Sequence, residues 1–207
     1  MSHSLNGVYQ GTCSTGVALN LKGATRLLTA GHCLGSTFIN NGNMVGQTYT
    51  TAYPTNADIY GDWKAIQGST YSNYVWNGTV SGTSTLPINS ANWGLRMVGD
   101  PVCASGQTTG QTCRYFVLSP QVGITFAGVA TWPLVQMRHD SNNGTGFDKN
   151  GWGSGDSGGP CYYADGNGGV TALGIVTGRS FPSTSYTLYY CTLLKGVRAW
   201  DPSATLA

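Results

Sequence analysis

The segment GWGSGDSGGP, residues 151–160, gathers glycines around one serine, Ser157, and offers the clearest potential for chemistry in the sequence. A serine hydroxyl becomes a nucleophile when a histidine base takes its proton, and the base needs a carboxylate that fixes its orientation. The chain has 3 histidines, His3, His32 and His139, and all of them precede Ser157. The segment therefore suggests a nucleophile whose base lies upstream.

Two other patterns overlap with this segment, and their context argues against both. Residues 153–158 spell the dinucleotide fingerprint G-x-G-x-x-G, but no helical period follows them, as that site would require. Residues 155–159 spell the nucleophile elbow of α/β-hydrolases, which needs a histidine after Ser157. With His32 as the base, the acid must follow it, because the first acidic residue of the chain is Asp58. The order histidine, aspartate, serine remains.

The elements that must position these residues are predicted to be strands. Short apolar or alternating segments, among them ATRLLTA, RYFVLSP and TALGIVTG, recur between turn signals, which favours antiparallel sheets over βαβ units. Only 9% of the 207 residues are charged and 31 are glycine, as is typical of turn-rich β structure. The final segment, KGVRAWDPSATLA, is predicted to contain a short helix.

Charge, hydropathy and cysteine content exclude several classes of protein. The formal charge of +2 is too small to indicate nucleic acid or an anionic membrane as a partner. No apolar run is long enough to span a bilayer, and the start of the chain lacks the layout of a signal peptide. The 6 cysteines predict disulfides and an oxidising compartment, and without a C-x-x-C motif they do not suggest zinc. We expect a secreted protein without cofactor or metal.

Two motifs resemble those of the chymotrypsin-like serine proteases: TAGHC at residues 29–33 and GDSGGP at residues 155–160. The bacterial α-lytic protease and streptogrisin branch is the closer likeness, because VCASGQTTGQTCRYF at residues 102–116 resembles its cysteine hairpin. The resemblance implies an all-β fold of two antiparallel six-stranded β-barrels, packed with the active site in the cleft between them. Residues 1–92 would carry the histidine and the aspartate, and residues 93–207 the serine, the oxyanion hole and the specificity pocket.

The resemblance also implies a role for each residue of the catalytic site. Ser157 would be the nucleophile and His32 the general base, and the backbone N–H groups of Gly155 and Ser157 would form the oxyanion hole. Asp58 and Asp62 are the candidates for the acid. Asp62 is preferred because it directly precedes the apolar segment WKAI.

Asp156, just before the serine, has a different role in the family. Its carboxylate is buried there and paired with a cation, because an unpaired buried charge is costly. The position of the arginine that serves this purpose in the bacterial branch is Ala104 here. Arg114, Arg138 and Lys149 are therefore the candidates for the cation.

The specificity pocket implied by the resemblance has Gly151 at its base, Trp152 beside it, and a wall of Thr177, Gly178 and Arg179. Without an acidic residue at its base, the pocket is not expected to take arginine or lysine. We expect an apolar or aromatic side chain in the first position of the substrate, or alternatively an acidic one bound by Arg179.

The expected function is that of a secreted serine endopeptidase, a monomer that acts on protein or peptide substrates. A pro-region and a protein inhibitor are candidate partners, and nucleic acids and membranes are not expected. The alternatives are a catalytically silent binding protein of the chymotrypsin fold and a secreted carbohydrate-binding sandwich. The resemblance implies two disulfides, Cys13–Cys33 and Cys103–Cys113. Cys161 and Cys191 remain, and we expect them to form a third disulfide, which the usual pairs of the family do not supply.

Overall fold

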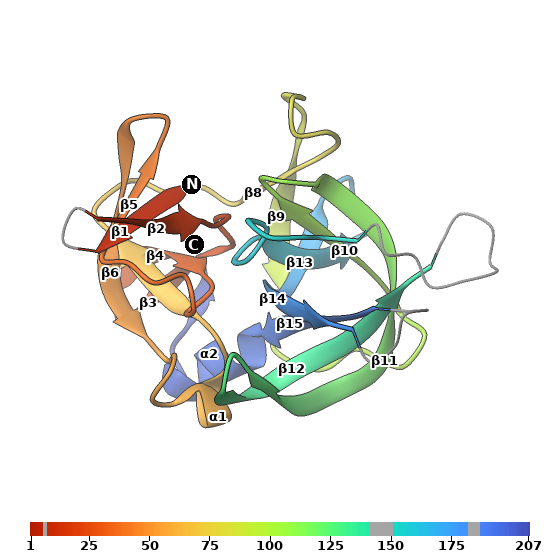
Figure 1. The fold of residues 1–207 in the computed structure, drawn as a ribbon. Coiled ribbons are helices and arrows are strands. Elements are labelled where there is room, and N and C mark those ends of the chain that lie inside the picture. Colours follow the sequence, from red (N-terminus) through yellow and green to blue (C-terminus); the bar gives the residue numbers. More distant parts are fainter. Residues whose placement is uncertain (6–7, 141–150, 182–186) are drawn as a thin grey trace.

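The computed structural model describes residues 1–5, 8–140, 151–181 and 187–207, and two β-sheets lying side by side make up most of it (Figure 1). In the described residues, the first sheet has eight strands. Their hydrogen-bonded order is β16 (Thr205–Leu206), β3 (Ala18–Leu21), β4 (Ala24–Thr29), β7 (Lys64–Gln67), β6 (Asn43–Thr51), β5 (Thr37–Asn40), β1 (Ser2–Leu5) and β2 (Val8–Thr12).

The second sheet also has eight strands within the described ranges, and six of them form a closed ring. The ring closes because β13 pairs with both β10 and β14. The hydrogen-bonded order is β13 (Pro160–Ala164), β10 (Pro101–Gly106), β11 (Gly110–Phe126), β12 (Val129–His139), β15 (Leu188–Leu193), β14 (Val170–Ser180), β9 (Thr85–Ala91) and β8 (Tyr74–Trp76). The predicted all-β class is confirmed, and the pair of β9 with β14 is parallel.

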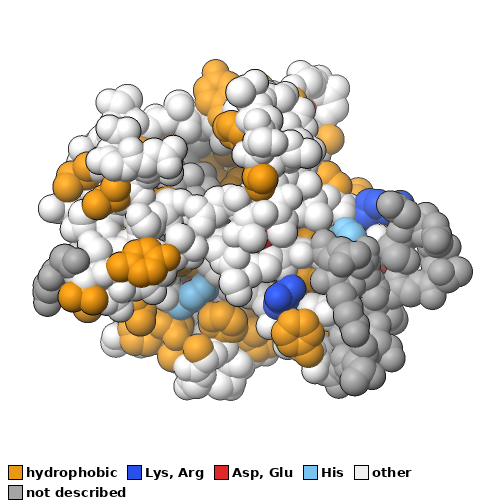
Figure 2. Space-filling model, turned by 45° about the horizontal axis from the view of Figure 1, so that its top comes forward, with side chains coloured by type: hydrophobic (Ala, Val, Ile, Leu, Met, Phe, Trp, Pro, Cys, Tyr) orange, Lys and Arg blue, Asp and Glu red, His pale blue; other side chains and the backbone are white. Residues whose placement is uncertain are grey.

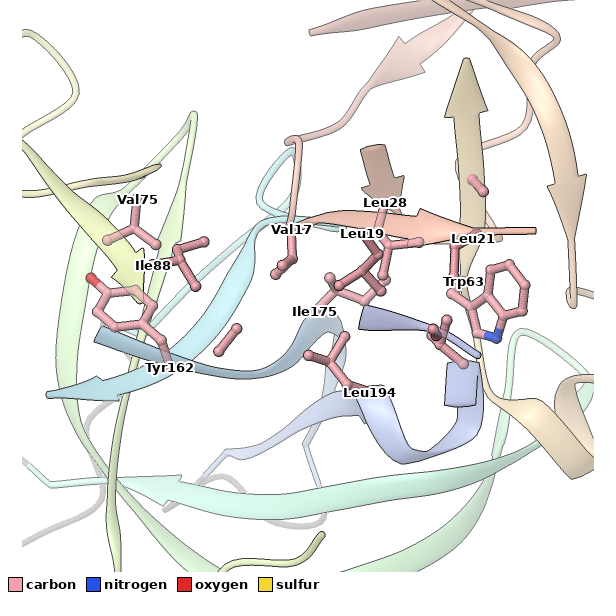
Figure 3. Packing of buried hydrophobic residues seen from close by; sticks show 14 of the residues in the cluster. Val17, Leu19, Leu21, Leu28, Trp63, Val75, Ile88, Tyr162, Ile175 and Leu194 are labelled. Atoms are coloured by element: carbon pink, nitrogen blue, oxygen red, sulfur yellow. The ribbon is translucent and has the colours of Figure 1, made fainter. Parts of the chain in front are cut away.

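The hydrophobic core extends across the contact between the two sheets. Figure 3 shows its side chains pointing toward one another from both sheets, because alternate residues of each strand face inward. All of the following are nearly or fully buried: Val17, Leu19, Leu21 and Leu28 in or next to strands of the first sheet, Val75, Ile88, Tyr162 and Ile175 in strands of the second, and Leu194 in the C-terminal helix. Because this cluster is continuous, the two sheets are held in a fixed relation.

The C-terminal segment ties the second sheet back to the first. The predicted short helix is present as α2 (Leu194–Trp200), which contacts α1 (Ala57–Tyr60), and β16 then pairs with β3. The indole of Trp200 packs edge-on against that of Trp63, with ring centroids 5.2 Å apart. Both chain ends consequently lie beside the first sheet (Figure 1).

Hydrogen bonds also connect the two predicted units across the expected boundary at residues 92 and 93. Strands β8 and β9 precede this boundary and pair with the second sheet, whereas β16 follows it and pairs with the first. The division into residues 1–92 and 93–207 stays a prediction. In the part of the chain that the structure describes, no helix has the length and apolarity needed to cross a membrane.

Candidate active site

The turn after strand β4 places His32 at the contact between the two sheets. Its backbone N–H donates to Oδ1 of Asp62 at 2.8 Å, and its ring Nδ1–H donates to Oδ2 of the same carboxylate at 2.6 Å. On the other side of the ring, Nε2 lies 2.9 Å from Oγ of Ser157 and accepts a hydrogen bond from its hydroxyl group. The structure thus brings together three residues that are distant in the sequence.

The structure distinguishes between the two candidate acids. Asp62 lies between α1 and β7 and is completely buried, and its N–H donates to Oγ1 of Thr192 at 3.0 Å. Thr192 in turn bonds Thr177, which had been expected at the pocket wall, with 2.8 Å between the hydroxyl oxygens. Asp58 lies in α1 and is exposed. Asp62 therefore partners His32 and is held there by side chains of the second sheet.

Ser157 lies in a loop that is fixed from both sheets. The N–H of Ser14, from the first half, donates to the carbonyl of Ser157 at 2.7 Å, and the Ser14 hydroxyl donates to the carbonyl of Gly155 at 2.9 Å. The N–H of Gly158 donates to the carbonyl of Val176 in β14 at 2.8 Å. These bonds fix the backbone on both sides of Ser157.

Thr108, in the turn between β10 and β11, orients the peptide group before Gly155. Its hydroxyl donates to the carbonyl of Ser154 at 2.8 Å. Because the C=O and N–H of a trans peptide point in opposite directions, this bond turns the N–H of Gly155 away from the β10–β11 turn. Gly155 has a φ of +94°, which glycine adopts readily. Among the described residues, the N–H groups of Gly155 and Ser157 have no protein acceptor, so both are available to a substrate oxygen.

The buried carboxylate of Asp156 is satisfied by neutral donors from the same turn and from Gly153. Its Oδ1 accepts the N–H groups of Thr108 and Thr109 at 2.8 and 3.2 Å. Its Oδ2 accepts the N–H of Gly153 at 2.8 Å and the hydroxyl of Thr109 at 2.9 Å. Within the described ranges no cation forms an ion pair with Asp156.

The candidate cations have other positions or lie outside the structure's description. Arg138 forms an ion pair with Asp140 at 3.6 Å, and Lys149 lies outside the described residues. Arg114 has a φ of +69° in β11. Four hydrogen bonds from described residues compensate the lost hydration of the Asp156 charge, and a cation partner for Asp156 stays a prediction.

A cleft of about 390 Å³ opens beside these residues. Charged side chains are sparse on the face that Figure 2 shows, and none of the described residues that line the cleft is acidic. Of the predicted pocket residues, Gly151 lies behind the cleft and the other four line it. The full lining consists of His3, Gln10, Gly11, Thr12, Cys13, His32, Cys33, Leu34, Phe126, Trp152, Gly153, Ser154, Gly155, Ser157, Val176, Thr177, Gly178 and Arg179.

Phe126 forms a wall of the cleft that the sequence did not indicate. It ends β11 just before a two-residue turn, Ala127–Gly128, whose positive φ angles of 49° and 82° are typical of a tight hairpin. Its ring centroid lies 5.0 Å from that of His32, and its ring covers the Cα of Gly178. The hairpin thereby places an aromatic ring beside the histidine and over the pocket wall.

Lys64 holds the backbone that follows His32. It is only 5% exposed, and its ammonium group donates to the carbonyls of Cys33 at 2.7 Å and Gly35 at 3.1 Å. Burial lowers the pKa of Lys64 to about 8, and the negative charge of Asp62 opposes this shift. Cys33 is also tied to Cys13 by a disulfide. The histidine turn is therefore fixed on its far side by a covalent bond and by a buried cation.

His3, from β1, is a second imidazole in the cleft. Its Nδ1–H donates to the carbonyl of Leu34, so the neutral ring presents Nε2 as an acceptor beside Gly11. Burial lowers the pKa of His3, and the nearby charge of Lys64 acts in the same direction. His3 therefore adds a second hydrogen-bonding imidazole to the lining of the cleft.

All six cysteines form disulfides, and the described residues show no group of three or more side chains that would hold a metal. One bond joins Cys103 to Cys113 in the β10–β11 hairpin, whose turn holds Asp156. Another joins Cys161 in β13 to Cys191 in β15, and both of these residues are completely buried. The covalent links thus lie close to the parts of the chain that hold His32, the oxyanion loop and the barrel interior.

Changing Asp156 to Asn is expected to lower the free energy of unfolding by about 1–3 kcal/mol. The new NH₂ group must face either the Thr108 and Thr109 N–H groups or that of Gly153, and one buried donor then loses its acceptor. Urea denaturation with the disulfides intact measures the change. Asp58→Asn, at an exposed position, is the matched control, and equal stabilities of the two variants would contradict the assignment.

Comparing the stability of the parent protein with that of Lys64→Met over a range of pH tests the lowered pKa of the buried Lys64 ammonium group. Its pKa is about 8 in the folded chain against 10.5 for a lysine exposed to water, so between these values the unfolded chain binds a proton that the folded chain has released. The stability of the parent relative to the variant should therefore rise from about pH 8 to about pH 10.5, as measured by denaturation at a series of pH values. Lys195→Met, at a partly exposed position in α2, controls for the loss of a lysine. A flat or falling difference would refute the prediction.

Comparison with known proteins gives relatives by structure only. No family model and no curated protein matches the sequence. A glutamic acid specific serine protease matches with a TM-score of 0.70 and 24% identity over 100% of this chain and 97% of its own. Thermobifida fusca protease A matches with a TM-score of 0.67 and 21% identity, over 100% and 95%. Nocardiopsis protease matches with a TM-score of 0.70 and 18% identity, over 100% and 96%.

These structures match the full extent of this chain, although fewer than a quarter of the residues are identical. The similarity therefore concerns the fold. The chain has the fold of the bacterial chymotrypsin-like serine proteases.

Proposed function

We propose that this protein is a serine endopeptidase that hydrolyses peptide bonds through an acyl-enzyme on Ser157. The observation that carries the proposal is the continuous hydrogen-bonded chain from Ser157 through His32 to the buried carboxylate of Asp62. This series of hydrogen bonds ends at a cleft, beside two backbone N–H groups that are free to bind an oxyanion. Nucleophile, base, acid and oxyanion donors are thus present in one place.

In the first half of the reaction, Oγ of Ser157 attacks the carbonyl carbon of the substrate while Nε2 of His32 takes its proton. Asp62 accepts hydrogen bonds from both the ring and the backbone of His32, which fixes the tautomer with a free Nε2 and stabilises the imidazolium. The negative charge that develops on the substrate oxygen is bound by the N–H groups of Gly155 and Ser157.

In the second half, the imidazolium of His32 donates its proton to the leaving amine, and the C–N bond breaks to leave an ester on Ser157. A water molecule then takes the place of the amine. His32 accepts a proton from this water, the hydroxide attacks the ester, and the released Ser157 oxygen regains its proton. The same residues therefore serve both steps, and no cofactor is required.

The lining of the cleft supports an apolar first side chain in the substrate. No described lining residue is acidic, so nothing there would pair with lysine or arginine. Arg179 supports the acidic alternative, since its guanidinium lies at the edge of the cleft. One of the similar structures is itself a glutamic acid specific protease that uses a histidine triad in substrate binding.

Three disulfides support secretion, because such bonds persist in oxidising compartments. We further propose protein or peptide substrates and a monomeric enzyme, with a pro-region or a protein inhibitor as candidate partners. The silent binding protein remains the alternative function. The intact set of Ser157, His32 and Asp62 argues against it, because such a chain of bonds serves no purpose in binding.

A serine-reactive fluorophosphonate should label the parent protein, and Ser157→Ala should remove the label. Asp62→Asn should lower kcat on a peptide substrate by about 10⁴-fold, because His32 then prefers the wrong tautomer. Asp58→Asn, in the neighbouring helix, should leave kcat unchanged and serves as the matched control. An unlabelled parent protein would favour the silent alternative.

Replacing Thr108 by the isosteric valine tests the oxyanion hole. The variant lacks the hydroxyl that fixes the Ser154 carbonyl, so the Gly155 N–H loses its orientation. We expect kcat to fall roughly 10- to 100-fold with little change in KM, since removal of a complete oxyanion donor costs about 10²–10³-fold. Thr85→Val, at an exposed position in strand β9, is the control. A rise in KM alone would show that Thr108 acts only in binding.

A further inference from the structure

The pocket predicted from the sequence for the first substrate side chain lies between residues 151–153 and residues 177–179, and all of these except Gly151 line the cleft. In the described structure, side chains of the protein itself occupy the space between them. We propose that Trp152 and Tyr189 fill this pocket, so that the enzyme cleaves after small residues: glycine, alanine and serine. This inference rests on the proposed protease function, and it replaces the expected preference for large apolar or aromatic residues by a preference for small ones.

Trp152 lies inside the pocket and does not merely border it. The residue is only 1% exposed, although it lines the cleft. Its indole Nε1–H donates to the carbonyl of Gly178 at 3.4 Å, so the ring extends from the segment that leads to Ser157 across to the opposite wall. A substrate side chain inserted between these two segments would meet the indole.

Aromatic neighbours hold the indole in this position. The ring centroid of Tyr115 lies 4.4 Å from that of Trp152, and the ring of Tyr189 packs edge-on at 5.0 Å. The Tyr115 hydroxyl accepts the backbone N–H of Trp152 at 2.8 Å. Displacing the indole would therefore break packed aromatic contacts, each of which contributes to stability beyond its buried area.

Tyr189 closes the base of the pocket. It is completely buried, and its hydroxyl accepts the N–H of Gly151 at 3.1 Å. A Cβ atom at residue 151 would overlap the Tyr189 ring, which shows that the ring lies directly against the glycine. The glycine at the base thus accommodates a phenol of the protein and leaves no room for a large substrate side chain.

Arg179 and Phe181 form the rim above the indole. The guanidinium of Arg179 donates to the backbone carbonyl of Trp152 at 3.2 Å and lies 5.1 Å from the centroid of the Phe181 ring. This hydrogen bond joins the two walls of the pocket at the surface. Deeper in the pocket, the hydrogen bond from the Trp152 indole to the Gly178 carbonyl joins the same two walls. With base, interior and rim occupied by side chains of the protein, the space between the two walls is closed to a large substrate side chain, although the cleft beside Ser157 stays open.

Profiling the parent enzyme on peptides that differ only in the residue before the cleaved bond tests the proposal. We expect kcat/KM for alanine to exceed that for phenylalanine and leucine by at least about 100-fold, since the fit of a single methylene changes kcat/KM by roughly 10- to 200-fold. Dominant cleavage after phenylalanine, tyrosine or leucine would overturn the proposal. Dominant cleavage after glutamate or aspartate would overturn it in favour of recognition by Arg179.

Trp152→Ala should open the pocket. The variant is expected to gain roughly 10- to 100-fold in kcat/KM for phenylalanine and leucine substrates while its activity on alanine substrates rises by less. Trp152→Phe, which keeps an aromatic ring, should show a smaller gain in the same direction. Trp76→Ala, at a tryptophan on the surface strand β8, should keep the parent profile. Unchanged selectivity in a folded Trp152→Ala would contradict the assignment.

Labelling of Ser157 by the fluorophosphonate separates this inference from the proposed function. A labelled parent enzyme that prefers large residues refutes only the filled pocket. A parent protein that is neither labelled nor active refutes the protease function and the inference with it. Where Trp152→Ala fails to fold, the profile of the parent and of Trp152→Phe decides the question.

Discussion

The buried carboxylate of Asp62 is the contact on which the rest of the site depends. It accepts hydrogen bonds from the ring and the backbone of His32, and removing either partner would leave a charge without compensation. Its own N–H is held by Thr192 of the second sheet. His32 and Asp62 thus adjoin neighbouring strands of the first sheet, β4 and β7, and Thr192 ties the pair to the second sheet. The core cluster that spans both sheets keeps them in contact.

A second buried carboxylate, Asp156, organises the other half of the site by a different device. Neutral N–H and hydroxyl donors of the β10–β11 turn bind it, and the same turn holds the Ser154 carbonyl through Thr108. One short turn thus compensates a buried charge and points a backbone N–H into the cleft. This arrangement couples the geometry of the proposed oxyanion hole to the stability of the loop, because both depend on the same residues.

The aromatic residues of the second half are arranged as a continuous core that reaches the substrate cleft. Trp152 belongs to the same buried cluster as Tyr115, Tyr189 and the Cys161–Cys191 disulfide. Specificity and core packing are therefore joined: the side chains that limit the pocket also fill the interior of the barrel. A change of specificity in this protein requires a change in its core, with the loss of stability that a cavity brings.

The sequence by itself determined the order of histidine, aspartate and serine, the strand-rich fold class and the glycine-rich loop around Ser157, because local patterns and motifs carry this information. It favoured Asp62 but could not decide against Asp58, since both lie in one short segment and only packing against His32 distinguishes them. It did not indicate that the β10–β11 turn would donate hydrogen bonds to Asp156, because that contact joins segments about 47 residues apart in the chain. Such choices depend on contacts between residues far apart in the chain, which only the folded arrangement of the two sheets brings together.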